Sequence, residues 1–118
     1  MAILLDEPQA DACAQILEQE GRILICAGTL TETLIVAGRR EVGAEARRLL
    51  DGLNFEIVAL TSSRAMRAAD AYKKWGEGVH PASLNFGDCF AYALSSEQAC
   101  PLLFVGEDFT QTDAASAL

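Results

Sequence analysis

The most informative segment of the chain is Asn85-Phe86-Gly87-Asp88-Cys89-Phe90-Ala91-Tyr92-Ala93-Leu94. Four of its apolar residues recur at helical spacing, namely Phe86, Phe90, Ala93 and Leu94. We therefore expect a helix that packs one face against a core. Asp88 falls outside this apolar stripe, and an acid in the first turn is stabilised by the helix dipole. A functional role for Asp88 requires partner groups elsewhere in the chain.

The composition describes one globular domain. The chain has 118 residues, 51% of them hydrophobic, so we expect residues 1–118 to form a single domain with one core. No apolar run reaches the length of a membrane span, and we expect a cytoplasmic protein without membrane contact. The four cysteines show no Cys-x-x-Cys spacing, and His80 is the only histidine. A zinc site is therefore not expected, and the thiols should be reduced and buried.

Short apolar runs alternate with segments of helical periodicity. The expected strands are 22–26, 55–59 and 102–105, and the expected helices are 6–20, 29–40, 42–53, 62–75 and 85–94. Asp6 is the expected N-cap of the first helix, and Thr29 with Glu32 has the spacing of a capping box. Strands alternating with helices predict an α/β fold, a three-layer α/β/α domain with a parallel sheet.

Acidic residues border the ends of the expected strands. Glu32 follows the first strand, Asp108 follows the third, and Asp88 begins the helix that leads into the third. Because ligands of parallel sheets bind outside the carboxyl ends of the strands, we expect these three carboxylates to converge. Carboxylates without histidines suit Mg²⁺ or Mn²⁺, which can activate water against a phosphodiester. The alternative is that each acid only caps a helix or faces solvent.

The positive residues occur in pairs although the net charge is -8. The pairs are Arg39-Arg40, Arg47-Arg48, Arg64 with Arg67, and Lys73-Lys74. Such pairs are usually a solvated helix face, but they can also serve as local contacts to phosphates. The net charge itself argues against binding polyanions over the whole surface.

Three motifs together resemble the PIN-domain ribonucleases, specifically the VapC toxins of bacterial toxin–antitoxin pairs. The segment 84–93 resembles the signature of that family, and 102–109 followed by Thr112-Asp113 is similar to its final strand and acidic loop. Thr29-Leu30-Thr31-Glu32 is similar to its second acidic motif, and His80-Pro81-Ala82 is typical of one VapC subgroup. The resemblance covers essentially the whole chain.

The resemblance implies a metal-dependent endoribonuclease that cleaves structured RNA such as tRNA. Glu32, Asp88 and Asp108 would be the catalytic residues and would hold Mg²⁺ or Mn²⁺, with Asp113 as an outer carboxylate of the metal site. The implied partner is a VapB-like antitoxin, and the expected assembly is a homodimer.

The start of the chain departs from the family pattern. VapC proteins ordinarily begin with an apolar strand that ends in an Asp, whereas Met1–Pro8 resembles the segment just after that strand. Asp6 matches the following loop, so we expect the first strand and its acid to be missing and the activity to be reduced. The edges left in the sheet should then be covered by residues 1–5, by neighbouring strands or by a second chain.

Two further interpretations remain open at this stage. The chain can be a VapC-like module that binds an antitoxin and cleaves poorly or not at all. It can also be an unrelated α/β domain whose acids only cap helices. A metal-dependent cleavage assay separates the nuclease from both alternatives.

Overall fold

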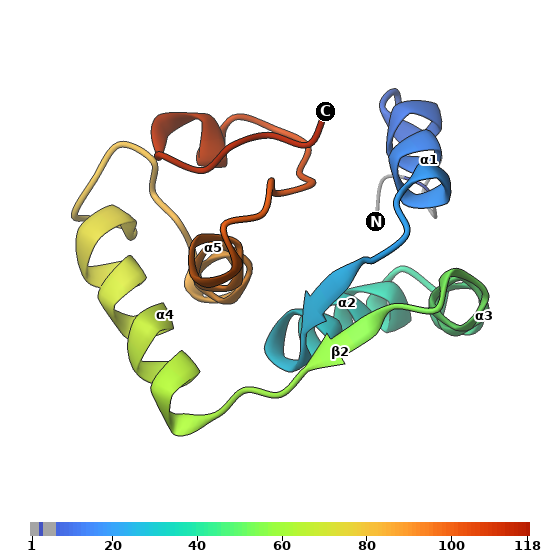
Figure 1. The fold of residues 1–118 in the computed structure, drawn as a ribbon, viewed down its shortest axis with the longest axis horizontal. Helices are drawn as coiled ribbons and strands as arrows, with labels where there is room; N and C mark the ends of the chain where they lie inside the picture. The colour runs from blue at the N-terminus through green and yellow to red at the C-terminus, as the bar shows by residue number, and fades with distance from the viewer. Residues whose placement is uncertain (1–2, 4–6) are drawn as a thin grey trace. The chain divides into compact units, whose positions relative to one another are not determined.

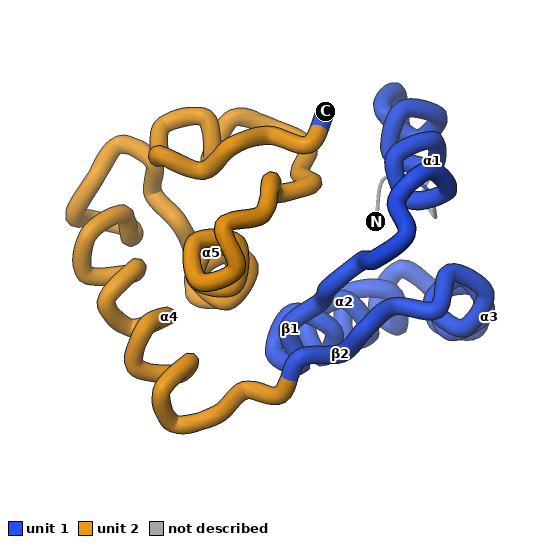
Figure 2. Tube along the Cα trace, viewed as in Figure 1, with its two compact units in different colours: residues 1–58, 118 blue, residues 59–117 orange. Residues whose placement is uncertain are grey.

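The computed structural model describes Ile3 and residues 7–118. The chain divides into two compact units, one made of Met1–Val58 with Leu118 and the other of Ala59–Ala117 (Figure 2). The expectation of a single domain over residues 1–118 stays a prediction.

The first unit contains a two-stranded parallel sheet. Strand β1 is Leu24–Cys26 and strand β2 is Glu56–Val58, and the chain between them forms helices α2, Ala27–Arg39, and α3, Gly43–Leu53 (Figure 1). Parallel strands need a helical crossover of this kind, because a short hairpin cannot reverse the chain direction. The α/β class with a parallel sheet is confirmed here, and each strand is shorter than predicted.

The register of the two strands places Ile25 opposite Ile57. Beside this pair, Arg22 donates two hydrogen bonds to the carboxylate of Glu56, with N···O distances of 2.8 and 3.1 Å. The Arg22 guanidinium holds the pKa of Glu56 below its usual range. Both side chains are exposed, so the pair fixes the register more than it adds stability.

Helix α1 spans Ala10–Gln19 and buries Ala10 and Cys13. The predicted N-cap, Asp6, lies outside the described residues. The prediction that residues 1–5 cover a sheet edge concerns a segment of which the structure describes Ile3 alone.

The predicted capping box of Thr29 and Glu32 is wrong. Helix α2 begins directly after β1, with Cys26 as its N-cap residue, so Thr29 is already the third residue of the helix. Its hydroxyl is buried without a hydrogen-bond partner among the described residues. Ala27 and Gly28 follow β1 directly and already form the first two residues of α2, so the helix starts earlier than the sequence suggests. Glu32 therefore lies in the second turn of α2 and is exposed.

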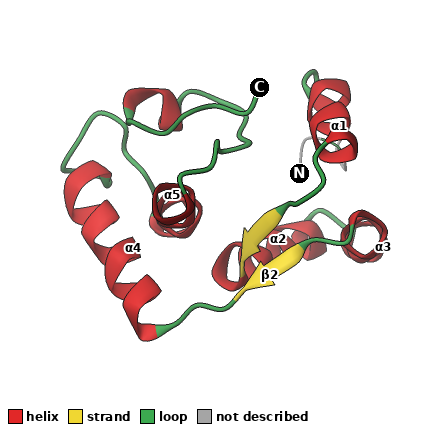
Figure 3. Cartoon of the chain, viewed as in Figure 1, coloured by secondary structure: helices red, strands yellow, loops and turns green. Residues whose placement is uncertain are grey.

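The second unit is built on two helices that pack against each other. Helix α4 spans Ser62–Trp75 and α5 spans Phe86–Gln98, and both confirm the predicted helices (Figure 3). Thr61 caps α4 by accepting a hydrogen bond from the Arg64 backbone N–H at 3.3 Å. The shared core contains eight buried residues: Ala68, Ala71, Ala82, Leu84, Cys89, Tyr92, Ala93 and Phe109.

The two helices run in opposite directions. Arg64, in the first turn of α4, donates a hydrogen bond of 3.2 Å to Glu97 at the end of α5. At the other end, the Leu84 N–H donates to the Trp75 carbonyl at 3.0 Å, just before α5 starts. This closed end of the hairpin carries the N-terminus of α5, where Asp88 lies.

The predicted third strand, 102–105, is wrong. Leu102 forms only an isolated parallel bridge with Ser116, through hydrogen bonds of 2.7 Å to the Ala115 carbonyl and 2.9 Å from the Ala117 N–H. The apolar run instead packs Leu102 and Phe104 against the core of α4 and α5. Its composition is that of a strand, but a ladder needs a partner of matching length, which a local pattern cannot specify.

Of the described helices, none is long and apolar enough to cross a membrane. All four cysteines are free thiols, and three of them are buried as predicted. Cys100 is exposed, because it lies just after the C-cap of α5.

Candidate functional site

Asp88 is the third residue of α5 and takes part in a reciprocal capping box. The Asp88 N–H donates to Asn85 Oδ1 at 2.9 Å, and the Asn85 N–H donates to Asp88 Oδ2 at 3.0 Å. Two backbone donors of the helix start are thereby satisfied. The second carboxylate oxygen, Oδ1, makes no hydrogen bond with the described residues. The cap therefore fixes the side chain of Asp88 and leaves one oxygen available.

Asp108 is positioned by the residue that follows it. It begins a short 3-10 helix, Asp108–Gln111, after Gly106 turns the chain with a φ of +105°. Phe109 is buried in the core and packs against Phe104 with 5.2 Å between the ring centroids. Because Phe109 anchors the turn, the neighbouring Asp108 stays at the surface of the core.

Asp88 and Asp108 lie close enough to affect each other electrostatically. Burial raises the pKa of Asp88, and the charges of Asp108 and Glu77 raise it further. The hydrogen bond from the Asn85 backbone lowers the pKa but does not cancel these effects. The charges of Asp108 and Glu77 thus act on Asp88 at the closed end of the α4–α5 hairpin, and a cation there would relieve this repulsion.

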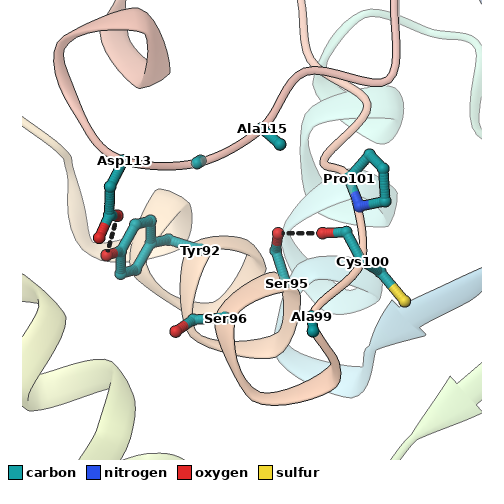
Figure 4. A pocket seen from close by; sticks show the side chains of 9 residues that line it. Tyr92, Ser95, Ser96, Ala99, Cys100, Pro101, Asp113 and Ala115 are labelled. Atoms are coloured by element: carbon teal, nitrogen blue, oxygen red, sulfur yellow. Dashed lines mark hydrogen bonds between the residues drawn. The ribbon is translucent and has the colours of Figure 1, made fainter.

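Asp113 forms a hydrogen bond with Tyr92. The Tyr92 hydroxyl donates to Asp113 Oδ1 over 2.5 Å, and the two side chains point toward each other in Figure 4. Burial raises the pKa of the Tyr92 phenol, and the bond to Asp113 adds to that effect. Tyr92 lies one helical turn after Asp88, so Asp113 contacts the same helix farther from its N-terminus.

Asp88 and Asp108 both belong to the second unit, and the charge of Asp108 raises the pKa of Asp88. Glu32 belongs to the first unit, on α2 shortly after the carboxyl end of β1. No group of three or more histidine, cysteine or acidic side chains suited to a metal ion occurs within the residues that the structure describes. The convergence of Glu32, Asp88 and Asp108 stays a prediction.

Two residues of this region were not expected from the sequence. Glu77 lies between Gly76 and Gly78 beside the end of a helix, and this position is the signal that could have marked it. The ring of Tyr92 is buried in the core, whereas its hydroxyl bonds to Asp113. Tyr92 follows Asp88 by four residues, and this spacing is the signal that could have placed both side chains on the same side of the helix.

His80 has a structural role, as expected for a loop residue. Its Nδ1 accepts a hydrogen bond from the Ala82 N–H at 3.0 Å. Its ring lies edge-on to Trp75, with 4.7 Å between the centroids. Both contacts stabilise the loop that joins α4 to α5.

A pocket of about 300 Å³ lies at the C-terminal half of α5. Its polar groups already bond to each other: Tyr92 to Asp113, and Ser95 Oγ to the Cys100 carbonyl at 2.6 Å (Figure 4). Neither Asp88 nor Asp108 lines it. The pocket is therefore separate from the carboxylate pair.

The donor chemistry of the carboxylate pair fits a hard divalent cation. Mg²⁺ keeps several waters and is commonly bound through one or two carboxylates. Asp88 Oδ1 has no hydrogen bond among the described residues, and the pKa of Asp88 is raised by burial and, to a smaller extent, by the charges of Asp108 and Glu77. Asp88 and Asp108 are thus the residues best suited to hold such an ion.

Comparison with known proteins gives one consistent family. The PIN domain family matches residues 1–115. Ribonuclease VapC30 of Mycobacterium tuberculosis (strain ATCC 25618 / H37Rv) is 37% identical over 119 residues, which are 98% of this chain and 91% of that protein. Ribonuclease VapC of Mycolicibacterium smegmatis is 36% identical over 119 residues, with 98% and 92% covered.

A more distant relative extends the match beyond mycobacteria. VapC ribonuclease R02377 of Rhizobium meliloti is 34% identical over 131 residues, which are 96% of this chain and 92% of that protein. The predicted fold class, a PIN-like α/β fold, is confirmed by the family match. The chain belongs to the PIN domain family and, within it, to the VapC group.

Proposed function

We propose that the protein is a VapC-type toxin, an endoribonuclease that hydrolyses RNA phosphodiester bonds with Mg²⁺ or Mn²⁺. The observation that carries this proposal is that the chain belongs to the VapC group and holds Asp88, with one carboxylate oxygen unbonded, at the start of α5, where the charge of Asp108 acts on it. The names of the relatives describe ribonucleases, and the proposal extends that activity to this chain.

Each residue of the pair has a defined task in this proposal. Asp88 and Asp108 hold the cation, which supplies an activated water and stabilises charge on the phosphate. Asn85 keeps the Asp88 carboxylate in one orientation through the capping box, and Phe109 keeps Asp108 at the edge of the core. We propose Glu32 as a further catalytic ligand and Asp113 as an outer carboxylate that acts through water.

A second candidate function is an antitoxin-binding module with weak or no cleavage. Asp88 and Asp113 already use an oxygen for internal hydrogen bonds, Asp88 with Asn85 and Asp113 with Tyr92. This leaves fewer free oxygens for a metal ion. In both cases we propose a VapB-like antitoxin as partner, a homodimeric assembly and a cytoplasmic location, with structured RNA such as tRNA as the substrate of the nuclease.

A cleavage assay separates the two candidates. Purified protein is incubated with total tRNA in Mg²⁺ or Mn²⁺, with and without EDTA, beside the variants Asp88→Asn and Asp70→Asn. Asp70 is an exposed acid of α4 and provides the matched control. The nuclease predicts cleavage that EDTA and Asp88→Asn abolish and Asp70→Asn leaves intact. Antitoxin binding without metal-dependent cleavage would favour the second candidate.

A further inference from the structure

One aromatic residue that is expected in the core is exposed in the structure. Phe86 was predicted to lie on the buried stripe of α5, yet its side chain is 75% exposed. Ala93 and Leu94 of the same predicted stripe are buried, and Phe90 packs partly against the core. Helical spacing shows which residues share a face but does not show how far along the helix that face is covered. Phe86 extends past the end of the core.

The exposed aromatic ring is held in a fixed arrangement. The rings of Phe86 and Phe90 meet edge to face, with centroids 5.0 Å apart and an interplanar angle of 85°. This geometry is favourable for aromatic pairs. The outer face of Phe86 is therefore presented to solvent on a regular helix instead of a loop.

The side of α5 that carries Phe86 can be located from ion pairs. Phe86, Phe90, Ala93 and Glu97 are spaced by four, three and four residues, so they lie along one face of α5. Glu97 at the end of this face pairs with two residues of α4, Arg64 at 3.2 Å and Arg67 at 3.9 Å. The Arg67 side of α4 is thus the side next to this face.

Lys74 lies on that same side of α4. It follows Arg67 by seven residues, which is two helical turns, and so it shares the Arg67 face at the closed end of the hairpin. Its Nζ lies 4.8 Å from the centroid of the Trp75 ring. Within the described residues Lys74 makes no ion pair, whereas Arg64 and Arg67 are paired. Lys74, whose ammonium group lies over Trp75 without an ion-pair partner among the described residues, and the exposed ring of Phe86 are therefore located toward the same end of the hairpin.

This surface adjoins the carboxylate pair. Phe86 and Asp88 belong to the first turn of α5 and are separated by about 3 Å along its axis. The two residues are about 200° apart around the helix, so a strand that reaches both has to pass over the start of α5. Every Lys or Arg between residues 59 and 117 lies on α4, so positive charge in this unit is confined to that helix.

We propose that Phe86 and Lys74 bind a single-stranded segment of RNA, with an unpaired base stacked on Phe86 and a backbone phosphate at Lys74. The proposal rests on the proposed function and assigns two residues outside the carboxylate pair to substrate binding. Aromatic platforms combined with cations are the means by which proteins bind single strands without reading their sequence. A protein partner fits less well, because lysine is depleted in the buried centres of protein interfaces.

The stacking contact is tested by fluorescence anisotropy with a labelled single-stranded oligoribonucleotide. The parent protein carries Asp88→Asn, so that the RNA stays intact while it binds. Phe86→Ala should weaken binding roughly fivefold to a hundredfold, and Phe86→Trp should retain it. Met66→Ala removes another exposed apolar side chain, on α4, and should have no effect. A fully paired duplex should bind with the same affinity to the parent and to Phe86→Ala.

The phosphate contact is tested by the dependence of binding on salt. Lys74→Gln should lower the slope of log K against log salt by about 0.7, the value for one phosphate contact on a single strand. Lys73→Gln is the matched control, because it removes the same charge from the neighbouring position, about 100° around the helix. In the active protein, Phe86→Ala and Lys74→Gln should raise KM and leave kcat unchanged.

Unchanged RNA affinity in Phe86→Ala, or equal slopes for Lys73→Gln and Lys74→Gln, would overturn the inference. So would loss of a dimer in Phe86→Ala, measured by light scattering, together with normal RNA binding, since Phe86 would then belong to a protein interface. These results leave the proposed function intact if Asp88→Asn still abolishes cleavage. If the unmodified protein does not cut RNA and the Asp88→Asn parent does not bind it, both the inference and the proposed function are overturned.

Discussion

The hydroxyl of Tyr92 donates a 2.5 Å hydrogen bond to Asp113 and thereby joins the middle of α5 to the segment after the 3-10 turn. Tyr92 is only 8% exposed, and Trp75 packs against its ring with 6.2 Å between centroids. The bond thus links a buried donor to an acid of the surface loop. Thr112 supports the same loop by donating to the Phe109 carbonyl at 2.7 Å.

Tyr92→Phe removes this bond while it keeps the ring. We expect the free energy of unfolding to fall by about 1–2 kcal/mol, as for hydrogen bonds to charged groups. Urea denaturation measures the change. Asp113→Asn is the control, because an amide oxygen can still accept the bond and the loss should be smaller. Equal stability of Tyr92→Phe and the unmodified protein would show that the bond contributes nothing.

Metal binding should stabilise the protein against heat. A cation held by Asp88 and Asp108 binds the folded state, and a tenfold excess over Kd adds about 1.4 kcal/mol. Titration with Mn²⁺ should therefore raise Tm, and Asp88→Asn and Asp108→Asn should each abolish the rise. Asp70→Asn should behave as the unmodified protein. A rise that persists in both site variants would place the ion elsewhere.

The ion pairs of Glu97 should make stability depend on pH. Gln98 donates to Glu97, and Arg64 and Arg67 add further attraction, so the pKa of Glu97 is lowered from 4.5 in the folded protein. A lowered pKa contributes stability that is complete above 4.5 and is lost as the pH falls through the folded value. Glu97→Gln should consequently lower Tm at pH 7 and lose its effect in strong acid.

The control for this series is Glu18→Gln, which changes an exposed acid of α1. Thermal unfolding followed by circular dichroism at several pH values gives both curves. If Glu97→Gln lowers Tm equally at pH 7 and in strong acid, the loss comes from packing and not from the carboxylate charge.

Cys89 should resist alkylation in the folded state. Burial, and secondly the charge of Asp88, raises the pKa of the Cys89 thiol to about 11. At pH 8 only about one thiol in a thousand is then ionised, and the thiolate is the reactive form. Iodoacetamide followed by mass spectrometry should modify the exposed Cys100 and spare Cys89. Comparable modification of both at early times would contradict the burial of Cys89.

The helices could be predicted from the sequence better than their starts and the sheet. The helices around Ala46, Ala68 and Tyr92 follow from apolar periodicity, which is a local property of the chain. The start of α2 was missed because Cys26 carries no capping side chain, and Thr29 offered a false cap. The prediction of a strand at Leu102 is wrong because strand pairing depends on residues that are distant in the sequence.

The candidate site could be predicted only in part, because local motifs mark some of its residues and others depend on distant parts of the chain. Asp88 and Asp108 follow from their motifs, and their joint role in a metal site stays a prediction. The contributions of Glu77 and the Tyr92 hydroxyl depend on how the loops fold back on α5, which no local pattern records. The exposure of Phe86 likewise depends on where the core ends.

The hairpin of α4 and α5 has a consequence for the order in which the site assembles. Its ion pair between Arg64 and Glu97 spans 33 residues, so the hairpin can close by local search as the chain leaves the ribosome. Asp108 and Phe109 follow the hairpin in the chain, so we expect Asp108 to reach Asp88 only after the hairpin has formed. The repulsion between the two carboxylates would then arise late in assembly, when the rest of the hairpin is already in place to hold them.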